Sequence, residues 1–139
     1  MPTIFTRIIG GQIPGTFVWR DEYCVVFLSI NPMAHGHCLV VPIEEVDHWV
    51  DADSDLIAHL FEVTRVIGVA LKQAFACERV GVIIAGYEVP HTHIHVIPTQ
   101  SMSQLSFANA ATTIDRNSMD AAADAIRSAL RHAGRAEVC

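Results

Sequence analysis

Apolar and polar residues change their spacing several times along the chain, and each change predicts a new element. Apolar residues at helical spacing near the N-terminus predict a short helix over residues 3–9, which Gly10 and Gly11 end. Asp21 and Glu22 form a tight turn between two apolar runs, which predicts a hairpin. The strands expected in the first half of the chain cover residues 16–20, 23–29 and 37–41.

Two longer segments repeat their apolar residues at a spacing close to 3.6, the period of an α-helix. The first covers about residues 55–75, and Asp53 or Ser54 can cap its N-terminus. The second begins at Ser118, which we expect to cap it, and Gly134 is placed to end it. Both segments therefore predict amphipathic helices that pack against a sheet.

Two further strands are expected between these helices. Residues 80–85 are apolar on both faces, which is typical of a strand at the centre of a sheet. Residues 91–97 form a strand between Pro90 and Pro98, and residues 100–117 are polar and irregular. The hairpin and the two separated helices predict a single α+β domain over residues 1–139, with a five-stranded, largely antiparallel sheet.

The composition of the chain argues against two classes of partner, nucleic acids and membranes. The chain has 139 residues, of which 51% are hydrophobic, enough for a core. A formal charge of −6 lacks the basic footprint of a nucleic-acid binder, so we expect no nucleic-acid partner. No apolar run approaches the roughly 18 residues that span a bilayer, and the N-terminus has no signal-peptide core. We therefore expect no membrane partner, and a cytoplasmic location agrees with four cysteines that form no CxxC pair.

The most informative segment runs from Pro90 to Pro98, PHTHIHVIP, and carries three of the eight histidines. Because strand side chains alternate between faces, His91, His93 and His95 point the same way, with neighbouring pairs roughly 6.6 Å apart. Such imidazoles can converge on one anion or one metal ion. Three interpretations are open: a solvated row of histidines, a zinc site completed from elsewhere, and nucleophilic catalysis by a neutral imidazole.

The run HTHIHVI matches the histidine triad motif, and the chain resembles the histidine triad (HIT) superfamily of nucleotide hydrolases and transferases. The segments IFTRIIGGQIP, FLSINPMAHGHCLVVP and AGYEVPHTHIHVIP carry the resemblance. It covers a core of residues 3–98 and leaves residues 99–139 as a weakly matching C-terminal extension. The resemblance implies a HIT-like fold that pairs as a homodimer, and a small-molecule nucleotide as substrate, with no cofactor and no bound metal.

The resemblance also implies catalytic roles for four histidines. His93 would attack the α-phosphorus of a nucleotide and form a nucleotidyl-histidine intermediate, which water then hydrolyses. His95 would contact the phosphate and help to protonate the leaving group, and the backbone carbonyl of His91 would hold the ring of His93. His37, in the segment GHCLVVP, would lie beside the triad. We expect the other histidines to be solvated surface residues: His35, His48, His59 and His132.

The same resemblance implies a base and ribose pocket at Phe27, Ser29 and Ile30. Ile30 fits a wall against the base. Ser29 stands where the family has an aspartate that accepts hydrogen bonds from both ribose hydroxyls. A single hydroxyl can make only part of that pattern, so ribose recognition is expected to differ in this chain.

The loop before the triad would meet the phosphate, and it also departs from the family's pattern. Gly86 still permits a close approach of the backbone to a ligand. Tyr87 offers a hydroxyl in place of an amide, and Glu88 adds negative charge where an anion should sit. The expected binding residues of this loop are Gly86, Tyr87, Glu88 and Val89.

The leading hypothesis from the sequence is a hydrolase or transferase that acts through a covalent His93 intermediate. Its expected substrate is a phosphoramidate or mixed anhydride of AMP or GMP. A dinucleoside polyphosphate hydrolase would use the same chemistry. A nucleotide-binding module with little turnover is the alternative from another class, and the altered Ser29, Tyr87 and Glu88 motivate it.

Overall fold

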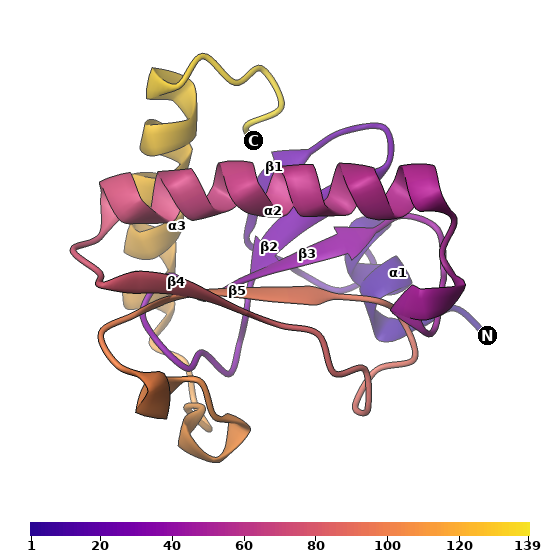
Figure 1. Cartoon of the computed structure of the whole chain (residues 1–139), viewed down its shortest axis with the longest axis horizontal. Helices are drawn as coiled ribbons and strands as arrows, with labels where there is room; N and C mark the ends of the chain where they lie inside the picture. The colour runs from indigo at the N-terminus through magenta and orange to yellow at the C-terminus, as the bar shows by residue number, and fades with distance from the viewer.

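Five strands form one antiparallel sheet in the order β1-β2-β3-β5-β4 (Figure 1). The computed structural model describes residues 1–139. β3 pairs with β5 and places Leu39 opposite His95, so residues on either side of a long sequence gap meet inside the sheet. The strands are β1 (Phe17–Arg20), β2 (Cys24–Leu28), β3 (Cys38–Pro42), β4 (Arg79–Ile83) and β5 (Ile94–Thr99).

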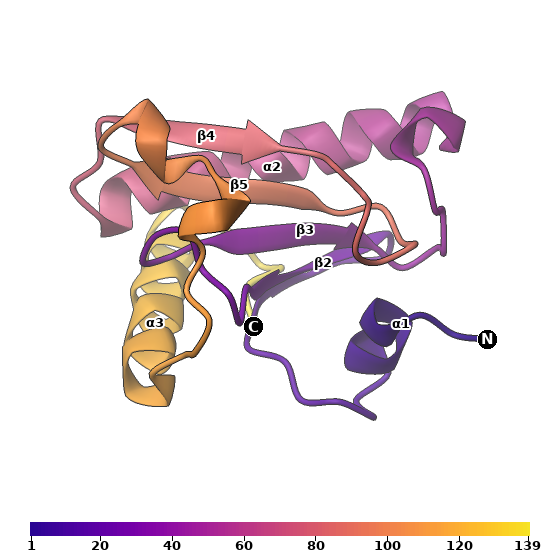
Figure 2. The same ribbon diagram turned by 90° about the horizontal axis from the view of Figure 1, so that it is seen from below.

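The period-two alternation along β2 separates two apolar layers on opposite faces of the sheet. One face packs against α2 (Ser54–Ala74) and α3 (Arg116–His132), and it holds the main core of 21 buried residues. The other face packs against α1 (Ile4–Ile9) through a smaller group: Phe5, Val25, Phe27, Leu39 and Val41. The two views of the ribbon show α1 and α2 on opposite sides of the sheet (Figures 1 and 2).

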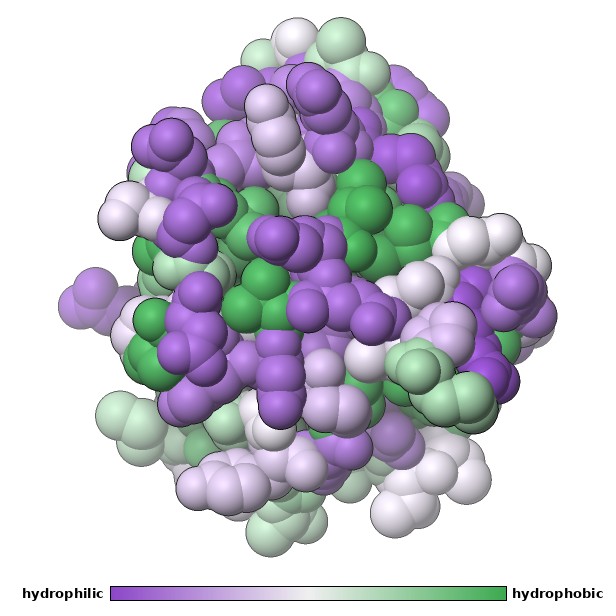
Figure 3. Space-filling model, turned by 90° about the vertical axis from the view of Figure 1, so that its right-hand side faces the viewer, coloured by the Kyte–Doolittle hydropathy of each residue, from purple (hydrophilic) through white to green (hydrophobic).

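Three short 3₁₀ helices complete the chain: η1 (Trp49–Asp51), η2 (Met102–Gln104) and η3 (Phe107–Asn109). The segment that holds η2 and η3 crosses the sheet on the face opposite α2 (Figure 2). One end of the molecule carries α1, η1 and the loop between β4 and β5. On this face, exposed apolar residues lie between hydrophilic ones (Figure 3). No helix has the length and apolar character needed to cross a bilayer.

The sequence predicted the five strands and the three α-helices, including the Asp53 cap of α2, whose side chain accepts the N–H of Leu56, but it predicted none of the 3₁₀ helices. One prediction about position was wrong: β4 lies at the edge of the sheet and not at its centre, because only β5 pairs with it. The side chain of Val82, which looked buried from its apolar neighbours, is 45% exposed there.

Three predicted boundaries were also wrong. The strand expected over residues 80–85 ends at Ile83. β5 begins at Ile94 and not at His91, because the N–H of Thr92 bonds to the carbonyl of Val46, outside the ladder. α3 begins after Asp115 and not at Ser118, because the Asp115 side chain accepts the N–H of Asn117 and satisfies the first turn. Gly134 does follow the end of α3, in the left-handed conformation at φ +80°.

Candidate active site

The hydrogen bonds of His93 define which of its ring nitrogens can react. Nδ1 of His93 lies 2.7 Å from the backbone carbonyl oxygen of His91. Because a carbonyl oxygen only accepts, Nδ1 carries the hydrogen of the neutral ring, and Nε2 keeps a free lone pair. Phe5 of α1 packs edge-on against this ring, with 5.0 Å between centroids. The ring is therefore held in the form in which Nε2 can act as a nucleophile.

A chain of hydrogen bonds leaves a hydrogen on Nε2 of His95, where His93 has a lone pair. The N–H of Met33 donates to Nδ1 of His37 over 3.0 Å, so the hydrogen of the neutral His37 ring is on Nε2. That Nε2 donates to Nδ1 of His95 over 2.9 Å, which leaves the His95 hydrogen on its own Nε2. The rings of His93 and His95 lie 5.0 Å apart. A lone pair and an N–H donor thus stand side by side.

His91 is oriented by bonds to both ring nitrogens. Its Nε2 lies 2.7 Å from the carbonyl oxygen of Pro42, and its Nδ1 lies 2.7 Å from the hydroxyl of Thr3. The side chain is completely buried. Since His37 and His91 use both ring nitrogens, a metal ion bound by three of these imidazoles would require one of them to give up a hydrogen bond. Zinc takes three or four protein ligands, so the arrangement fits paired imidazole chemistry better than a zinc centre.

Burial keeps the four rings neutral at pH 7. It lowers the pKa of His37 to about 3, with a further contribution from His95. It lowers the pKa of His95 to about 4, with a contribution from His93. The pKa values of His91 and His93 are also lowered, chiefly by burial, although the carbonyls that they bond oppose the shift. Neutral imidazole, the nucleophilic form, is therefore the resting state.

A cavity of about 440 Å³ opens beside His93 and His95. This volume lies within the range of small-molecule sites. Its walls come from α1, the end of β2, the residues before β3, and the segment that leads into α3. Two charged residues besides the histidines line it, Glu88 and Arg116. The cavity thus combines apolar walls with polar side chains, among them the histidines, Glu88 and Arg116.

Most of the predicted binding residues line this cavity. The side chain of Ser29 is turned toward its own backbone, since its hydroxyl accepts the N–H of Asn31 over 3.1 Å. Ile30 lies at the mouth and is 66% exposed. The predicted residues brought together around the cavity are Phe27, Ser29, Ile30, His37, Glu88, Val89, His93 and His95.

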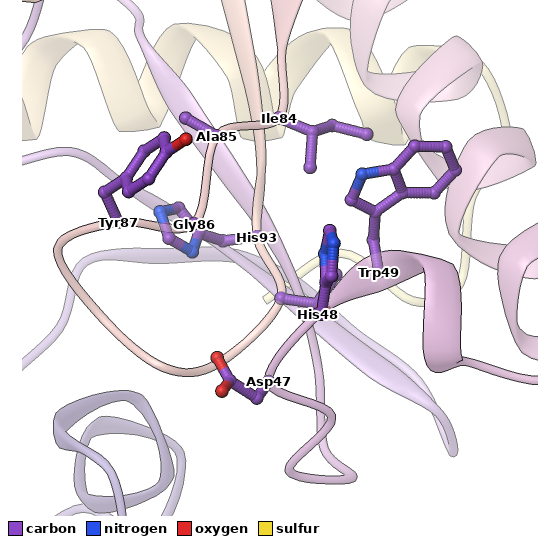
Figure 4. Close-up of a pocket in the computed structure, with 9 residues that line it drawn as sticks. Asp47, His48, Trp49, Ile84, Ala85, Gly86, Tyr87 and His93 are labelled. Carbon is purple, nitrogen blue, oxygen red and sulfur yellow. The ribbon is translucent and has the colours of Figure 1, made fainter.

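The remaining predicted residues of the loop, Gly86 and Tyr87, line a second cavity of about 280 Å³ (Figure 4). Tyr87 and His93 lie on one side of this cavity, and His48 and Trp49 lie on the other. His93 is the residue common to the walls of both cavities. The Tyr87 side chain is almost fully exposed, so it makes little contact with the rest of the chain.

Several residues of the large cavity were not identified from the sequence. Phe107 in η3 packs edge-on against His95, with 5.1 Å between centroids. Its segment is held in place by Asn31, whose Nδ2 donates to the carbonyl of Ala111 over 3.0 Å. A single aromatic residue within the polar segment was the available signal for Phe107. Arg116 gave none, because it lies far along the chain from the triad.

The other histidines are outside the hydrogen-bonded group of the site, although His48 lines the second cavity together with His93. His48 and His132 are exposed, as predicted, and so is His35. His59 was predicted to be a solvated surface residue, but it is half-buried, and its Nε2 lies 2.8 Å from a carboxylate oxygen of Asp21. It bonds there because α2 packs over the turn that Asp21 forms.

Asp21, Cys24 and His59 place their polar atoms within 4.8 Å of one another. The carboxylate of Asp21 already accepts hydrogen bonds from the Trp19 indole and the N–H of Tyr23. Burial raises the pKa of the Cys24 thiol, which keeps it protonated. The group therefore organises the β1–β2 turn against α2.

Comparison with known proteins identifies the family. Residues 10–102 match the model of the HIT domain. An uncharacterized HIT-like protein of Borreliella burgdorferi is 36% identical over 102 residues, which are 68% of this chain and 73% of the relative. The adenylylsulfatase HINT3 of Arabidopsis thaliana is 28% identical over 100 residues, 68% of this chain and 51% of the relative.

A solved structure from the same family has a similar fold. A crystal structure of a hypothetical histidine triad nucleotide-binding protein from Sulfolobus tokodaii superposes with a TM-score of 0.83 at 26% identity, covering 94% of this chain and 93% of that one. Its five-stranded sheet and helices therefore agree with those described above. The chain belongs to the HIT domain family, which includes nucleotide-binding proteins and hydrolases.

Proposed function

We propose that the chain is a nucleotide hydrolase or nucleotidyl transferase that cleaves the α-phosphate bond of an AMP or GMP phosphoramidate or mixed anhydride. One observation carries the proposal: the hydrogen bonds leave a lone pair on Nε2 of His93 and a hydrogen on Nε2 of His95. A nucleophile and a hydrogen-bond donor then share the wall of one cavity. The relatives described as nucleotide-binding and as an adenylylsulfatase support a nucleotide substrate.

In the first step, Nε2 of His93 attacks the α-phosphorus, and a nitrogen–phosphorus bond forms as the bond to the leaving group breaks. The nitrogen of the leaving amine takes a proton from water and departs as a neutral amine, while the hydrogen on Nε2 of His95 stays in place and donates to a phosphoryl oxygen. The positive charge that develops on the His93 ring is stabilised by the carbonyl of His91, which still accepts the Nδ1 hydrogen. The product of this step is a nucleotidyl-histidine and a free amine.

In the second step, water attacks the same phosphorus, and the bond to Nε2 of His93 breaks. The water gives up one proton, which neutralises the hydroxide formed when the amine was protonated, and both rings are back in their starting state. His37 acts throughout by donating to Nδ1 of His95, which keeps the exchangeable hydrogen of His95 on the side of the cavity. The nucleoside monophosphate leaves, and an acceptor other than water would give transfer in place of hydrolysis.

The charges around the cavity favour these substrates over a dinucleoside polyphosphate. Arg116 is the one lysine or arginine in its lining, and Glu88 supplies an opposing carboxylate. Each additional phosphate would bring negative charge without a further cation to meet it. A leaving group with little negative charge fits this lining better.

A low-turnover nucleotide-binding module is a second candidate, and the position of Ser29 favours it. The Ser29 hydroxyl accepts a backbone hydrogen bond and offers a bound ribose little. Weak positioning of the ribose would reduce the rate more than it reduces binding through the apolar walls. Calorimetry that detects AMP binding, together with no release of AMP from any substrate of a panel, would favour this candidate.

The histidine chemistry is tested by replacing the nucleophile. We expect His93→Ala to lower kcat for adenosine 5′-phosphoramidate by at least about a thousandfold, since removing a nucleophile disables both steps. His132→Ala, at the exposed end of α3, is the matched control and should retain wild-type kcat. Mass spectrometry of acid-sensitive and base-stable adducts should locate the nucleotidyl group on the peptide that contains His93. Wild-type activity in His93→Ala would exclude the mechanism.

We also propose that the chain forms a homodimer. β4 has one unpaired edge, and Val82 on this strand and Val69 on the neighbouring α2 are about half-exposed. Burying such residues against a second copy would remove apolar surface from water. A mass near that of the 15.2 kDa monomer in light scattering would contradict the dimer.

A further inference from the structure

We infer that Thr3 is a positioning residue for the proposed reaction. Glu45 anchors its backbone N–H, and its hydroxyl fixes the ring of His91 and through it the ring of His93. This role depends on the proposed function only for what the His93 ring does. The hydrogen bonds themselves belong to the fold, and they can be tested without substrate. None of the sequence motifs pointed to Thr3 or to Glu45.

The first link is the bond between Thr3 and His91. Nε2 of His91 lies 2.7 Å from the carbonyl oxygen of Pro42, which only accepts, so Nε2 carries the ring hydrogen. Nδ1 must then accept, and the hydroxyl of Thr3, 2.7 Å away, donates to it. The two bonds select one tautomer of the neutral ring.

The second link holds the Thr3 hydroxyl in the orientation needed for donation. Its oxygen accepts the N–H of Thr6 over 3.1 Å, which caps α1. The Thr6 hydroxyl lies 3.3 Å from it, farther than Nδ1 of His91, and donates instead to Oε1 of Glu45 over 2.6 Å. The hydrogen of Thr3 is therefore left for His91.

Glu45 anchors the start of α1 from outside. Its Oε1 also accepts the backbone N–H of Thr3 over 2.8 Å. Hydrogen bonds from Thr6 and Thr3 lower the pKa of Glu45, so its carboxylate remains ionised and acts as an acceptor at neutral pH. One exposed carboxylate thus fixes both threonines.

The third link carries the constraint to the nucleophile. The carbonyl of His91 accepts the Nδ1 hydrogen of His93, and its direction depends on the conformation of residue 91. That conformation is fixed by the ring bonds to Thr3 and Pro42, and by the bond from the His91 N–H to the carbonyl of Val89 over 2.8 Å. A change at Thr3 would let the carbonyl rotate and would disorder the lone pair of His93.

Thr3 could instead serve only as the cap of α1, and three variants separate the two roles. Thr3→Val removes both the cap and the donor, Thr3→Ser keeps both, and Thr3→Asp keeps a capping acceptor without a hydroxyl hydrogen. With adenosine 5′-phosphoramidate, we expect kcat to fall about tenfold in Thr3→Val and in Thr3→Asp, the loss typical of one buried hydrogen bond. Thr3→Ser should lie within about twofold of wild type, and KM should change less than kcat in Thr3→Asp. Wild-type kcat in Thr3→Asp would reduce Thr3 to a cap and overturn the role.

A substrate-free measurement tests the same link. Two-dimensional ¹H–¹⁵N spectra of the imidazoles report which nitrogen of His91 carries the hydrogen. We expect Nε2–H in the wild type and in Thr3→Ser, and a population of Nδ1–H in Thr3→Asp, whose carboxylate accepts. A wild-type His91 with hydrogen on Nδ1 would overturn the inference. If His93→Ala kept full activity, the proposed function would fail, whereas these spectra would still decide the hydrogen-bond chain.

Discussion

Acid should destabilise the protein well above the pH at which its carboxylates titrate, because buried histidines must stay neutral in the fold. The pKa of His37 falls from 6.5 to about 3 and that of His95 falls from 6.5 to about 4. These groups have lowered folded pKa values, so their contribution is present above 6.5 and is lost as the pH falls below it. The unfolded chain takes up protons there that the folded chain refuses.

The size of the effect follows from these shifts. Between pH 7 and pH 5.5, each histidine that stays neutral in the fold lowers the free energy of unfolding by about 1.2 kcal/mol. His37 and His95, at 2% and 7% exposure, together give a loss of about 2.5 kcal/mol. The lowered pKa values of His91 and His93 add to it. The formal charge of −6 becomes smaller over this range, which reduces self-repulsion and so opposes the loss of stability. A net fall in the free energy of unfolding can therefore be assigned to the buried rings.

The free energy of unfolding is measured as a function of pH by urea unfolding. The unfolding is followed by tryptophan fluorescence and repeated from pH 7.5 to pH 5. The carboxyl groups with lowered pKa values are Asp21, Glu45 and Glu62, and they lose their contribution only near and below their ordinary values, 3.8 for aspartate and 4.5 for glutamate, outside this window. We expect His37→Gln to reduce the loss by about 1.2 kcal/mol, and the exposed His132→Gln to leave it unchanged. Stability that is constant or rises between pH 7 and pH 5.5 would refute the neutral-ring description of the site.

Three further predictions concern single side chains. Thr92 is 2% exposed, and its hydroxyl has no hydrogen-bond partner. Thr92→Val should therefore stabilise the protein by about 1 kcal/mol in thermal or urea unfolding. A loss of stability would mean that the hydroxyl has a partner. Gly36 has φ +95°, and a Cβ there would lie 2.5 Å from the ring of Phe75. Gly36→Ala should therefore destabilise the fold by about 2 kcal/mol or more. Equal urea midpoints for the variant and the wild type would disprove this. Phe107→Ala removes the ring against His95 and should raise KM for adenosine 5′-phosphoramidate about fivefold, and an unchanged KM would show that η3 does not contact the substrate.

Periodicity was sufficient for the existence and type of every strand and for the three α-helices. It was insufficient for the place of β4 in the sheet, because an apolar run indicates contact with other apolar groups and not which strands supply it. Val82 is apolar but half-exposed at an edge. The start of α3 was missed because Asp115 and Ser118 are both good capping residues, and it is the Asp115 side chain that accepts the first-turn N–H of Asn117.

Strand alternation predicted that His91, His93 and His95 share a face, although β5 begins only at Ile94, and it could not predict their hydrogen-bonding states. Which nitrogen of His95 carries the hydrogen depends on the N–H of Met33, which acts through the ring of His37. Thr3 and Phe107 come from opposite ends of the chain and reach the triad only through tertiary packing. No local pattern contains such information.

The pairing of β3 with β5 also has a consequence for how the protein folds. It joins segments separated by more than fifty residues, with the whole of α2 and β4 between them. Closing a loop of this length is entropically costly, and contacts of long sequence separation form slowly. The bond between His37 and His95 spans 58 residues and that between Thr3 and His91 spans 88. We therefore expect the triad to be completed late in folding, so that regain of activity after dilution from urea lags behind regain of helical circular dichroism.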